Sequence, residues 1–292
     1  MKKLLQCPNS YAITDTLGGE LVSFRSGGIE YVWTGNSKFW NGHAPVLFPN
    51  VGELKDGAAV FGAREYHIPK HGIARKRQFK LLDADDTSVH FLLCADEETK
   101  SQYPFDFELH IIHTLYHDGF STEYRVVNPG KEPMPFCLGG HAGFCCPLHA
   151  NESFEDYCIR FSEQEHHPFH YTDENGLYLA KTIFPLQENG TILPLNYQVF
   201  NNDVLILDRV ASRKLELYHT RTKKGLSFEF HGFSALGLWT PPGKRAPFLC
   251  LEPWNGLPAS EQDPGVFEQK PYVVTLAPNE SYTAGYCMHL LG

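Results

Sequence analysis

The segment FDFELHIIHTLYHDGFSTEYRVVN, residues 105–128, decides the fold class. Apolar and polar residues alternate on both sides of the turn sequence HDGF, and this period of two is typical of half-buried strands joined in a hairpin. The same alternation recurs, between turn sequences such as NPGKEP and ENGT, at residues 88–95, 213–220 and 226–233. The sequence therefore predicts an all-β, mostly antiparallel protein.

The remainder of the chain supports one architecture throughout. No stretch keeps a long helical period, and the 25 glycines and 20 prolines are spread over all 292 residues without a low-complexity linker or an internal repeat. We therefore expect residues 1–292 to form a single large antiparallel sandwich domain. The polar stretch at 162–176 interrupts the strand pattern, and we expect a surface loop or hairpin tip there.

The composition of the chain argues against two classes of binding partner, nucleic acids and membranes. The chain has 25 Lys and Arg against 34 Asp and Glu, a net charge of -9, which argues against a nucleic-acid partner because phosphate binding needs a basic excess. The start, MKKLLQCPNSYAITD, has no apolar run of signal-peptide length and no later segment resembles a membrane span, so we expect a soluble cytoplasmic protein with no membrane partner. The eight cysteines form no CxxC pair, and we expect buried thiols without a catalytic role.

Two short segments combine a titratable side chain with a constrained backbone. In LGGHAGF (138–144), two glycines allow a tight bend that places His141 at a sheet edge. In CLEPWNG (250–256), Glu252 ends an apolar strand and Trp254 follows, which suits a carboxylate for sugar hydroxyls beside an aromatic face for the ring. An exposed turn histidine and an exposed strand-end glutamate are the alternative interpretations.

A third segment, KHGIAR (70–75), carries His71 inside the basic stretch 63–77. Such a stretch is usually a solvated face. It would also suit an anionic ligand such as a phosphorylated sugar, held by Arg64, Lys70, Arg75, Lys76 and Arg77. The sequence leaves both interpretations open.

These three segments, in this order, resemble motifs of the aldose 1-epimerase family, specifically of its LacX-type branch. KHGIAR resembles His-Gly-Phe-x-Arg, LGGHAGF resembles Gly-x-His-Pro-x-Phe, and CLEPWNG resembles a Glu-Pro-Trp segment. Supporting similarities extend along nearly the whole chain, at residues 39–54, 200–217, 235–243 and 268–273.

The resemblance implies a galactose mutarotase-like β-supersandwich that interconverts the α and β anomers of an aldose or sugar phosphate, without cofactor or metal. His141 resembles the general acid for the ring oxygen, Glu252 the general base for the anomeric hydroxyl, and His71 the second histidine on the ring-oxygen side. The implied substrate-binding residues are Asp203, Arg75, Trp254 and Trp40. For this chemistry near neutral pH we expect a charged His141 beside an ionised Glu252.

The sequence departs from the family motifs at three places. Ala142 stands where proline is usual and Ile73 where phenylalanine is usual. Gly42 and His43 occupy the place where some branches carry a substrate-binding arginine, so either Arg75 takes that role or the sugar is held differently.

Other functions remain as alternatives. A non-catalytic carbohydrate-binding or sugar-sensing protein could retain the same fold, although binding alone requires no acid and base. A metal site at His166, His167 and His170 beside Glu163 and Glu165 lacks recognisable zinc spacing, and a glycosidase pair of Asp203 and Glu252 fits the histidine motifs less well. We expect Trp33 and Trp239 in the core. The sugar and the choice between monomer and homodimer are open.

Overall fold

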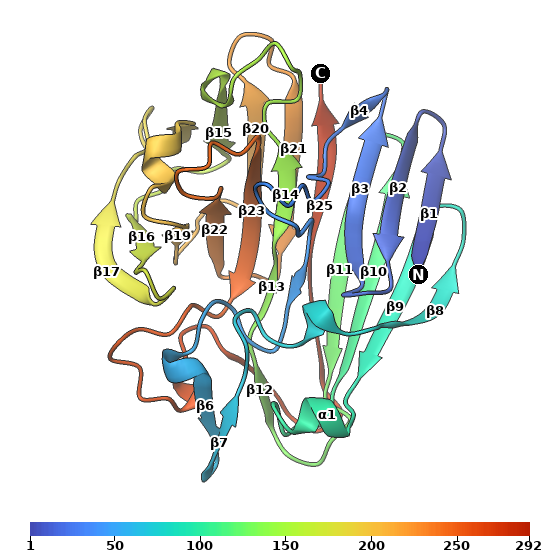
Figure 1. Ribbon diagram of the computed structural model, residues 1–292, viewed down its shortest axis with the longest axis vertical. Helices are drawn as coiled ribbons and strands as arrows, with labels where there is room; N and C mark the ends of the chain where they lie inside the picture. Colours follow the sequence, from blue (N-terminus) through green and yellow to red (C-terminus); the bar gives the residue numbers. More distant parts are fainter.

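The structure is a computed structural model describing residues 1–292, and antiparallel strands form its three main sheets. A nine-stranded sheet runs through the molecule (Figure 1) in the order β18 (Ile192–Pro194), β15 (Tyr157–Phe161), β20 (Lys214–His219), β21 (Gly225–His231), β25 (Ser281–Leu291), β11 (Gly119–Val127), β10 (Glu108–Tyr116), β9 (Ser88–Cys94) and β8 (Lys80–Ala84). The segments that predicted the fold class are β9, β10, β11, β20 and β21, so the all-β, antiparallel prediction is confirmed.

Two further sheets pack on the nine-stranded one. A four-stranded sheet holds β1 (Lys2–Cys7), β2 (Ser10–Asp15), β3 (Glu20–Ser26) and β4 (Ile29–Glu30). An eight-stranded sheet has the order β17 (Tyr178–Ile183), β16 (Phe169–Thr172), β19 (Leu205–Leu207), β22 (Ala235–Trp239), β23 (Phe248–Asn255), β13 (Leu138–Gly140) and β5 (Val46–Leu47), with β14 (Ala142–Cys145) also paired to β23.

The remaining elements are short. Two-stranded sheets pair β6 (Ala58–Phe61) with β7 (Arg64–His67) and β12 (Met134–Phe136) with β24 (Val274–Leu276). One α-helical turn, α1, covers Glu97–Lys100, and 3-10 turns lie at Lys55–Gly57, Ala74–Lys76, Phe154–Asp156, Tyr197–Phe200 and Phe267–Gln269. None of the helices has both the length and the apolar composition needed to cross a lipid bilayer.

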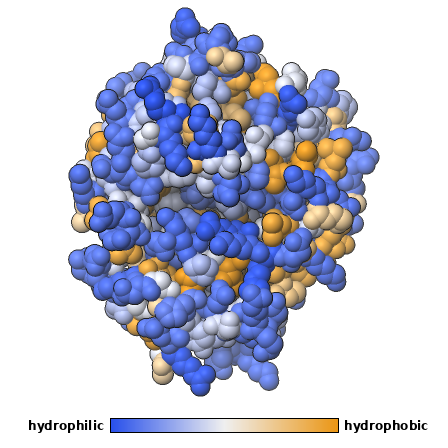
Figure 2. Space-filling model, viewed as in Figure 1, coloured by the Kyte–Doolittle hydropathy of each residue, from blue (hydrophilic) through white to orange (hydrophobic).

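Aromatic side chains join the three sheets into one core. Phe24 of β3 lies 5.4 Å from Phe120 of β11, and Phe144 of β14 lies 5.7 Å from Phe228 of β21, measured between ring centroids. A single cluster of 68 buried residues draws on segments from Leu5 to Met288. The face shown in Figure 2 is by contrast mostly hydrophilic. The sheets are therefore held together by apolar burial across their facing sides.

The polar stretch 162–176 differs in part from the expected surface loop. Phe169–Thr172 form β16, and Glu165 is buried because its carboxylate accepts hydrogen bonds from the backbone N–H groups of Ala211 and Ser212. Asp173–Gly176 do form the tip of the hairpin between β16 and β17. His166 and His167 are exposed, and the Glu165 carboxylate already binds backbone donors, so the stretch provides no metal cluster of the kind considered from the sequence.

The central strand β23 of the eight-stranded sheet is buried along its whole length. Its Trp254 lies over glycines on both neighbouring strands: a Cβ added at Gly139 of β13 would lie 2.7 Å from indole Cδ1, and one at Gly237 of β22 would lie 2.6 Å from indole Cζ2. The two glycines therefore create the space that the indole fills.

We expect Gly237→Ala to lower the free energy of unfolding by about 1 to 3 kcal/mol, because the added methyl group overlaps the Trp254 ring in a close-packed layer. Urea unfolding measures this. In a Trp254→Phe background the smaller ring relieves the overlap, so the same substitution should have a clearly smaller effect there. Equal effects in both backgrounds would contradict the packing explanation.

Candidate active site

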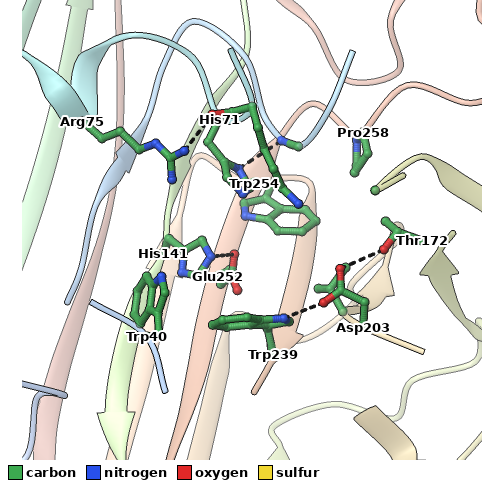
Figure 3. Close-up of a pocket in the computed structure, with 14 residues that line it drawn as sticks. Trp40, His71, Arg75, His141, Thr172, Asp203, Trp239, Glu252, Trp254 and Pro258 are labelled. Atoms are coloured by element: carbon green, nitrogen blue, oxygen red, sulfur yellow. Dashed lines mark hydrogen bonds and ion pairs between the residues drawn. The ribbon is translucent and has the colours of Figure 1, made fainter. Parts of the chain in front are cut away.

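A cavity of about 210 Å³ opens on β23 and collects side chains from distant parts of the chain (Figure 3). All seven site residues expected from the sequence line it, together with seven others; the full set is Trp40, Gly52, Lys70, His71, Arg75, His141, Thr172, Gly176, Asp203, Val204, Trp239, Glu252, Trp254 and Pro258. Strand ends and the loops that follow them supply most of these residues.

Glu252 lies at the floor of the cavity. It is two residues from Trp254 on β23, so both side chains project from the same face of the sheet. Glu252 is the register partner of Gly237 on β22, which has no side chain to lie beside the carboxyl group. Only 1% of Glu252 is exposed, and the group is therefore largely removed from water.

His141 lies beside Glu252. It connects β13 to β14, and its backbone N–H donates to the carbonyl of Pro45. The imidazole stacks on Trp40 with 4.9 Å between ring centroids and meets the edge of Trp239 at 5.6 Å. These contacts fix the ring so that its Nε2 lies 3.3 Å from Oε2 of Glu252 (Figure 3).

Burial disfavours charge on both members of this pair. It lowers the pKa of His141 from its usual 6.5 to about 3, with smaller contributions from Arg75 and Lys70. It raises the pKa of Glu252 well above 4.5, and the negative charge of Asp203 adds to the rise. Burial thus opposes the expected resting state of a charged His141 beside an ionised Glu252 and favours the proton of the pair on Glu252, because a desolvated ion pair is costly.

His71 occupies an unusual backbone conformation with φ of 63°. Its backbone N–H donates to the carbonyl of Gly52 at 2.9 Å, and the Gly52 N–H donates to His71 Nδ1 at 3.1 Å. A left-handed conformation in a non-glycine residue is strained, and this reciprocal pair of hydrogen bonds holds it. Since Nδ1 accepts, the neutral imidazole carries its hydrogen on Nε2 and is a donor there.

The same burial keeps His71 neutral. Desolvation lowers the pKa of His71 well below 6.5, and His141, Arg75 and Lys70 lower it further. The planes of the two imidazoles are nearly perpendicular, with 5.5 Å between their centroids. The cavity therefore offers two histidines on one side of Glu252.

Two of the five cations in the basic stretch 63–77 reach the cavity, Lys70 and Arg75. Arg75 donates to the backbone carbonyl of Lys70 at 3.1 Å, and its Nε is buried without a partner. The others face elsewhere: Arg64 and Lys76 are exposed, and Arg77 pairs with Glu98. Most of the stretch is thus the solvated face considered from the sequence, and Lys70 and Arg75 are the two cations that differ.

Asp203 lies on the opposite side of the cavity from the histidines (Figure 3). Its carboxylate accepts hydrogen bonds from Trp239 Nε1 at 2.7 Å and from the Thr172 hydroxyl at 3.1 Å. The core assignment of Trp239 was therefore wrong, because this half-buried indole lines the cavity and orients Asp203. The core assignment of Trp33 is confirmed, since it is 6% exposed and stacks on Phe248.

Several buried polar atoms in the cavity lack a partner: Arg75 Nε, His141 Nδ1, Glu252 Oε1 and Trp254 Nε1. A buried donor or acceptor without a partner is costly in free energy. Four such atoms, on residues that all line one cavity, therefore lower the stability of the fold at this place.

The structure places each of the residues that depart from the family motifs. Gly42 leaves room for the ring of Trp40, because an added Cβ would lie 2.4 Å from indole Cζ2. His43 turns away to Glu20, which also accepts the His43 N–H. Ala142 is the first residue of β14, and Ile73 is buried. Arg75 is thus the arginine that faces the cavity.

Ligand-type atoms of His141, Cys250 and Glu252 all lie within 4.8 Å of one another. Nitrogen, sulfur and oxygen donors of this kind could hold a metal ion such as zinc. Burial, however, raises the pKa of the Cys250 thiol well above its usual value, which opposes the thiolate that binds metal. All eight cysteines are free thiols, and four of them are buried.

Comparison with known proteins links the chain to one protein family. The aldose 1-epimerase family model matches residues 5–286. The plasmid and chromosomal LacX proteins of Lactococcus lactis subsp. lactis are each 36% identical over 284 residues, covering 94% of this chain and 95% of theirs.

Solved structures agree with this placement. A galactose mutarotase related enzyme from Lactobacillus acidophilus superposes with a TM-score of 0.93 at 27% identity, covering 100% of this chain and 98% of that one. A galactose mutarotase-like protein from Lactobacillus casei ATCC 334 gives a TM-score of 0.90 at 29% identity with complete coverage of both chains. The chain has the predicted galactose mutarotase-like β-supersandwich fold and belongs to the aldose 1-epimerase family.

Proposed function

We propose that this protein is an aldose 1-epimerase that opens and recloses the ring of an aldose and so interconverts its α and β anomers. The 3.3 Å separation between His141 Nε2 and Glu252 Oε2 carries the proposal. Ring opening removes a proton from the anomeric hydroxyl and delivers one to the ring oxygen. Both oxygens are bonded to the same carbon, so the base and the acid have to lie side by side, as this pair does.

In the proposed reaction Glu252 takes the proton of the anomeric hydroxyl while His141 gives one to the ring oxygen. The bond between C1 and the ring oxygen breaks, and an open-chain aldehyde forms. Rotation about the C1–C2 bond presents the other face of the aldehyde, and the reverse proton transfers close the ring. The proton that rests on Glu252 reaches His141 across their contact first, which makes the carboxylate a base and the imidazolium an acid.

The other cavity residues are assigned to binding. His71 donates a hydrogen bond from Nε2–H to the ring oxygen beside His141, since its Nδ1 already accepts the backbone N–H of Gly52. Asp203 accepts from sugar hydroxyls, in an orientation set by Trp239 and Thr172. Arg75 replaces the arginine that other branches carry ahead of the Ala-Pro segment, and Trp254 and Trp40 provide apolar faces for the C–H side of the ring.

Lys70 and Arg75 favour a phosphorylated aldose as a second candidate substrate, because two cations in one cavity would stabilise a phosphate group. A sugar-sensing role without catalysis is the other alternative. Pure binding gives no reason to bury a carboxyl group against a histidine, which favours catalysis over sensing.

We expect Glu252→Gln and His141→Asn each to lower kcat/KM for anomer exchange by about 100- to 10,000-fold, the usual contribution of a positioned acid or base. Polarimetry on freshly dissolved α-glucose, α-galactose and their 6-phosphates, corrected for spontaneous exchange, measures this. The matched controls Glu163→Gln and His166→Asn make the same chemical changes at exposed positions and should retain full activity. Binding of a sugar without any acceleration by the unmodified protein would support the sensing alternative.

The pH dependence follows from the burial of the pair. At low pH a second proton binds to the pair, which then no longer contains a base. Because burial lowers the pKa of His141 to about 3, we expect this second proton to bind at a pH far below the usual histidine pKa of 6.5. We therefore expect kcat/KM to keep most of its pH 7 value at pH 5, and to decline at alkaline pH once the raised pKa of Glu252 is passed. A half-maximal decline near pH 6.5 on the acid side would show an ordinary histidine and contradict this assignment.

A further inference from the structure

One irregular loop, residues 34–45 and called here the Trp40 loop, lies against the imidazole of His141. It contains no strand or helix and leads from the buried Trp33 to β5. Trp40 makes its contact with the imidazole, since the two rings stack with 4.9 Å between their centroids (Figure 3). The Trp40 carbonyl accepts the indole N–H of Trp33 at 2.8 Å, which ties the loop to the core. The orientation of the His141 ring therefore depends on where this loop lies.

The Trp40 loop also holds the backbone around His141. The His141 N–H donates to the carbonyl of Pro45 at 3.1 Å, and the Gly143 N–H donates to the carbonyl of His43 at 2.8 Å. A displacement of this part of the loop would therefore move the backbone and the ring of the histidine together. Since His141 Nε2 lies 3.3 Å from Oε2 of Glu252, such a movement would change the contact on which the proposed proton transfer depends.

A single carboxylate outside the Trp40 loop holds this part of it. Glu20 is the first residue of β3 in the four-stranded sheet, and its Oε1 accepts hydrogen bonds from the backbone N–H groups of His43 and Ala44, both at 2.9 Å. The Glu20 side chain is only 16% exposed, and Ala44 is buried. A carboxylate is a stronger acceptor than a neutral oxygen, and a buried donor without a partner is unfavourable. Without Glu20 the loop would therefore have to move until the two N–H groups found other acceptors.

The same device occurs at a second place in the molecule, which has no part in the cavity. The carboxylate of Glu165 accepts the backbone N–H groups of two successive residues, Ala211 at 2.9 Å and Ser212 at 2.8 Å, and Glu165 is 1% exposed. None of these three residues lines the cavity. Glu165 therefore provides a matched control for the loss of two such hydrogen bonds.

We propose that Glu20 is a positioning residue for the acid of the proposed reaction: by fixing the Trp40 loop, it holds His141 against Glu252. This inference rests on the proposed epimerase function for the role of His141. Glu20 does not line the cavity, so it acts through the loop and not on the reacting atoms. The four-stranded sheet then contributes to catalysis, because β3 carries this carboxylate.

The test measures kcat and KM for anomer exchange of glucose and galactose by polarimetry, together with urea unfolding. We expect Glu20→Ala to lower kcat about 10- to 100-fold, the scale of a misplacement of about 1 Å. KM should change by less than about threefold, because Asp203 and His71, which are assigned to binding, are held by other parts of the chain. Glu165→Ala should destabilise the fold at least as much and leave kcat and KM unchanged.

Two conservative variants separate the hydrogen bonds from the charge of Glu20. Glu20→Gln keeps the length of the side chain and an oxygen that accepts both N–H groups, so it should retain most of kcat. Glu20→Asp keeps the charge but is one methylene shorter, so it should lower kcat in the same direction as alanine. It is also the milder change, and the test therefore does not depend on the folding of the alanine variant.

An unchanged kcat in Glu20→Ala and Glu20→Asp, or an equal fall in Glu165→Ala, would overturn the inference and leave the epimerase function standing. A protein that accelerates no sugar would instead overturn the epimerase function. Crystal structures of the unmodified protein and the two alanine variants then decide. Displacement of Trp40 and His141 in Glu20→Ala, but not in Glu165→Ala, would show that Glu20 positions the histidine. An unmoved imidazole in Glu20→Ala would overturn the inference.

Discussion

A carboxyl group buried on the central strand of a sheet is the constraint on which this site depends. All eight residues of β23 are buried, and Glu252 lies in the middle of them. An ionised carboxylate in such a place is unfavourable by several kcal/mol unless it is paired and hydrogen-bonded. The contact with His141 meets this constraint, because one proton shared by the two groups leaves the pair neutral as a whole. Proton transfer to a sugar needs the same contact, so the arrangement that makes burial tolerable also supplies the proposed acid and base.

The walls around this pair are fixed by backbone features more than by strand pairing. His71 and Asp203 both have positive φ, 63° and 68°, and both lie in loops whose hydrogen bonds hold that conformation. Gly139 and Gly237 let Trp254 lie flat across three strands. Side chains placed by turns and packed rings lose little freedom when a ligand arrives, and such preorganisation favours tight positioning of the reacting atoms.

The sequence predicted the parts of this site that follow from local pattern. Period-two alternation identified five strands, and the family motifs identified His71, His141 and Glu252, which the fold brings together although they are far apart in the chain. Trp239 was missed because a tryptophan at the end of an apolar strand has the same local pattern whether its ring faces the core or a cavity. Thr172 and Glu165 lie in a polar stretch whose partners, Asp203 and the backbone at 211–212, are decided by tertiary structure. The pKa shifts of His141 and Glu252 were also beyond local pattern, since they depend on the depth of burial.

The two cations in the cavity do not require a phosphate to explain them. Lys70 and Arg75 each lower the pKa of His141, in addition to the larger effect of burial. An imidazolium with a lowered pKa is a stronger acid, and the ring oxygen of a sugar is a very weak base, so the shift favours the proton transfer that opens the ring. Lys70 also opposes the rise in the pKa of Glu252 and makes the carboxylate more accessible.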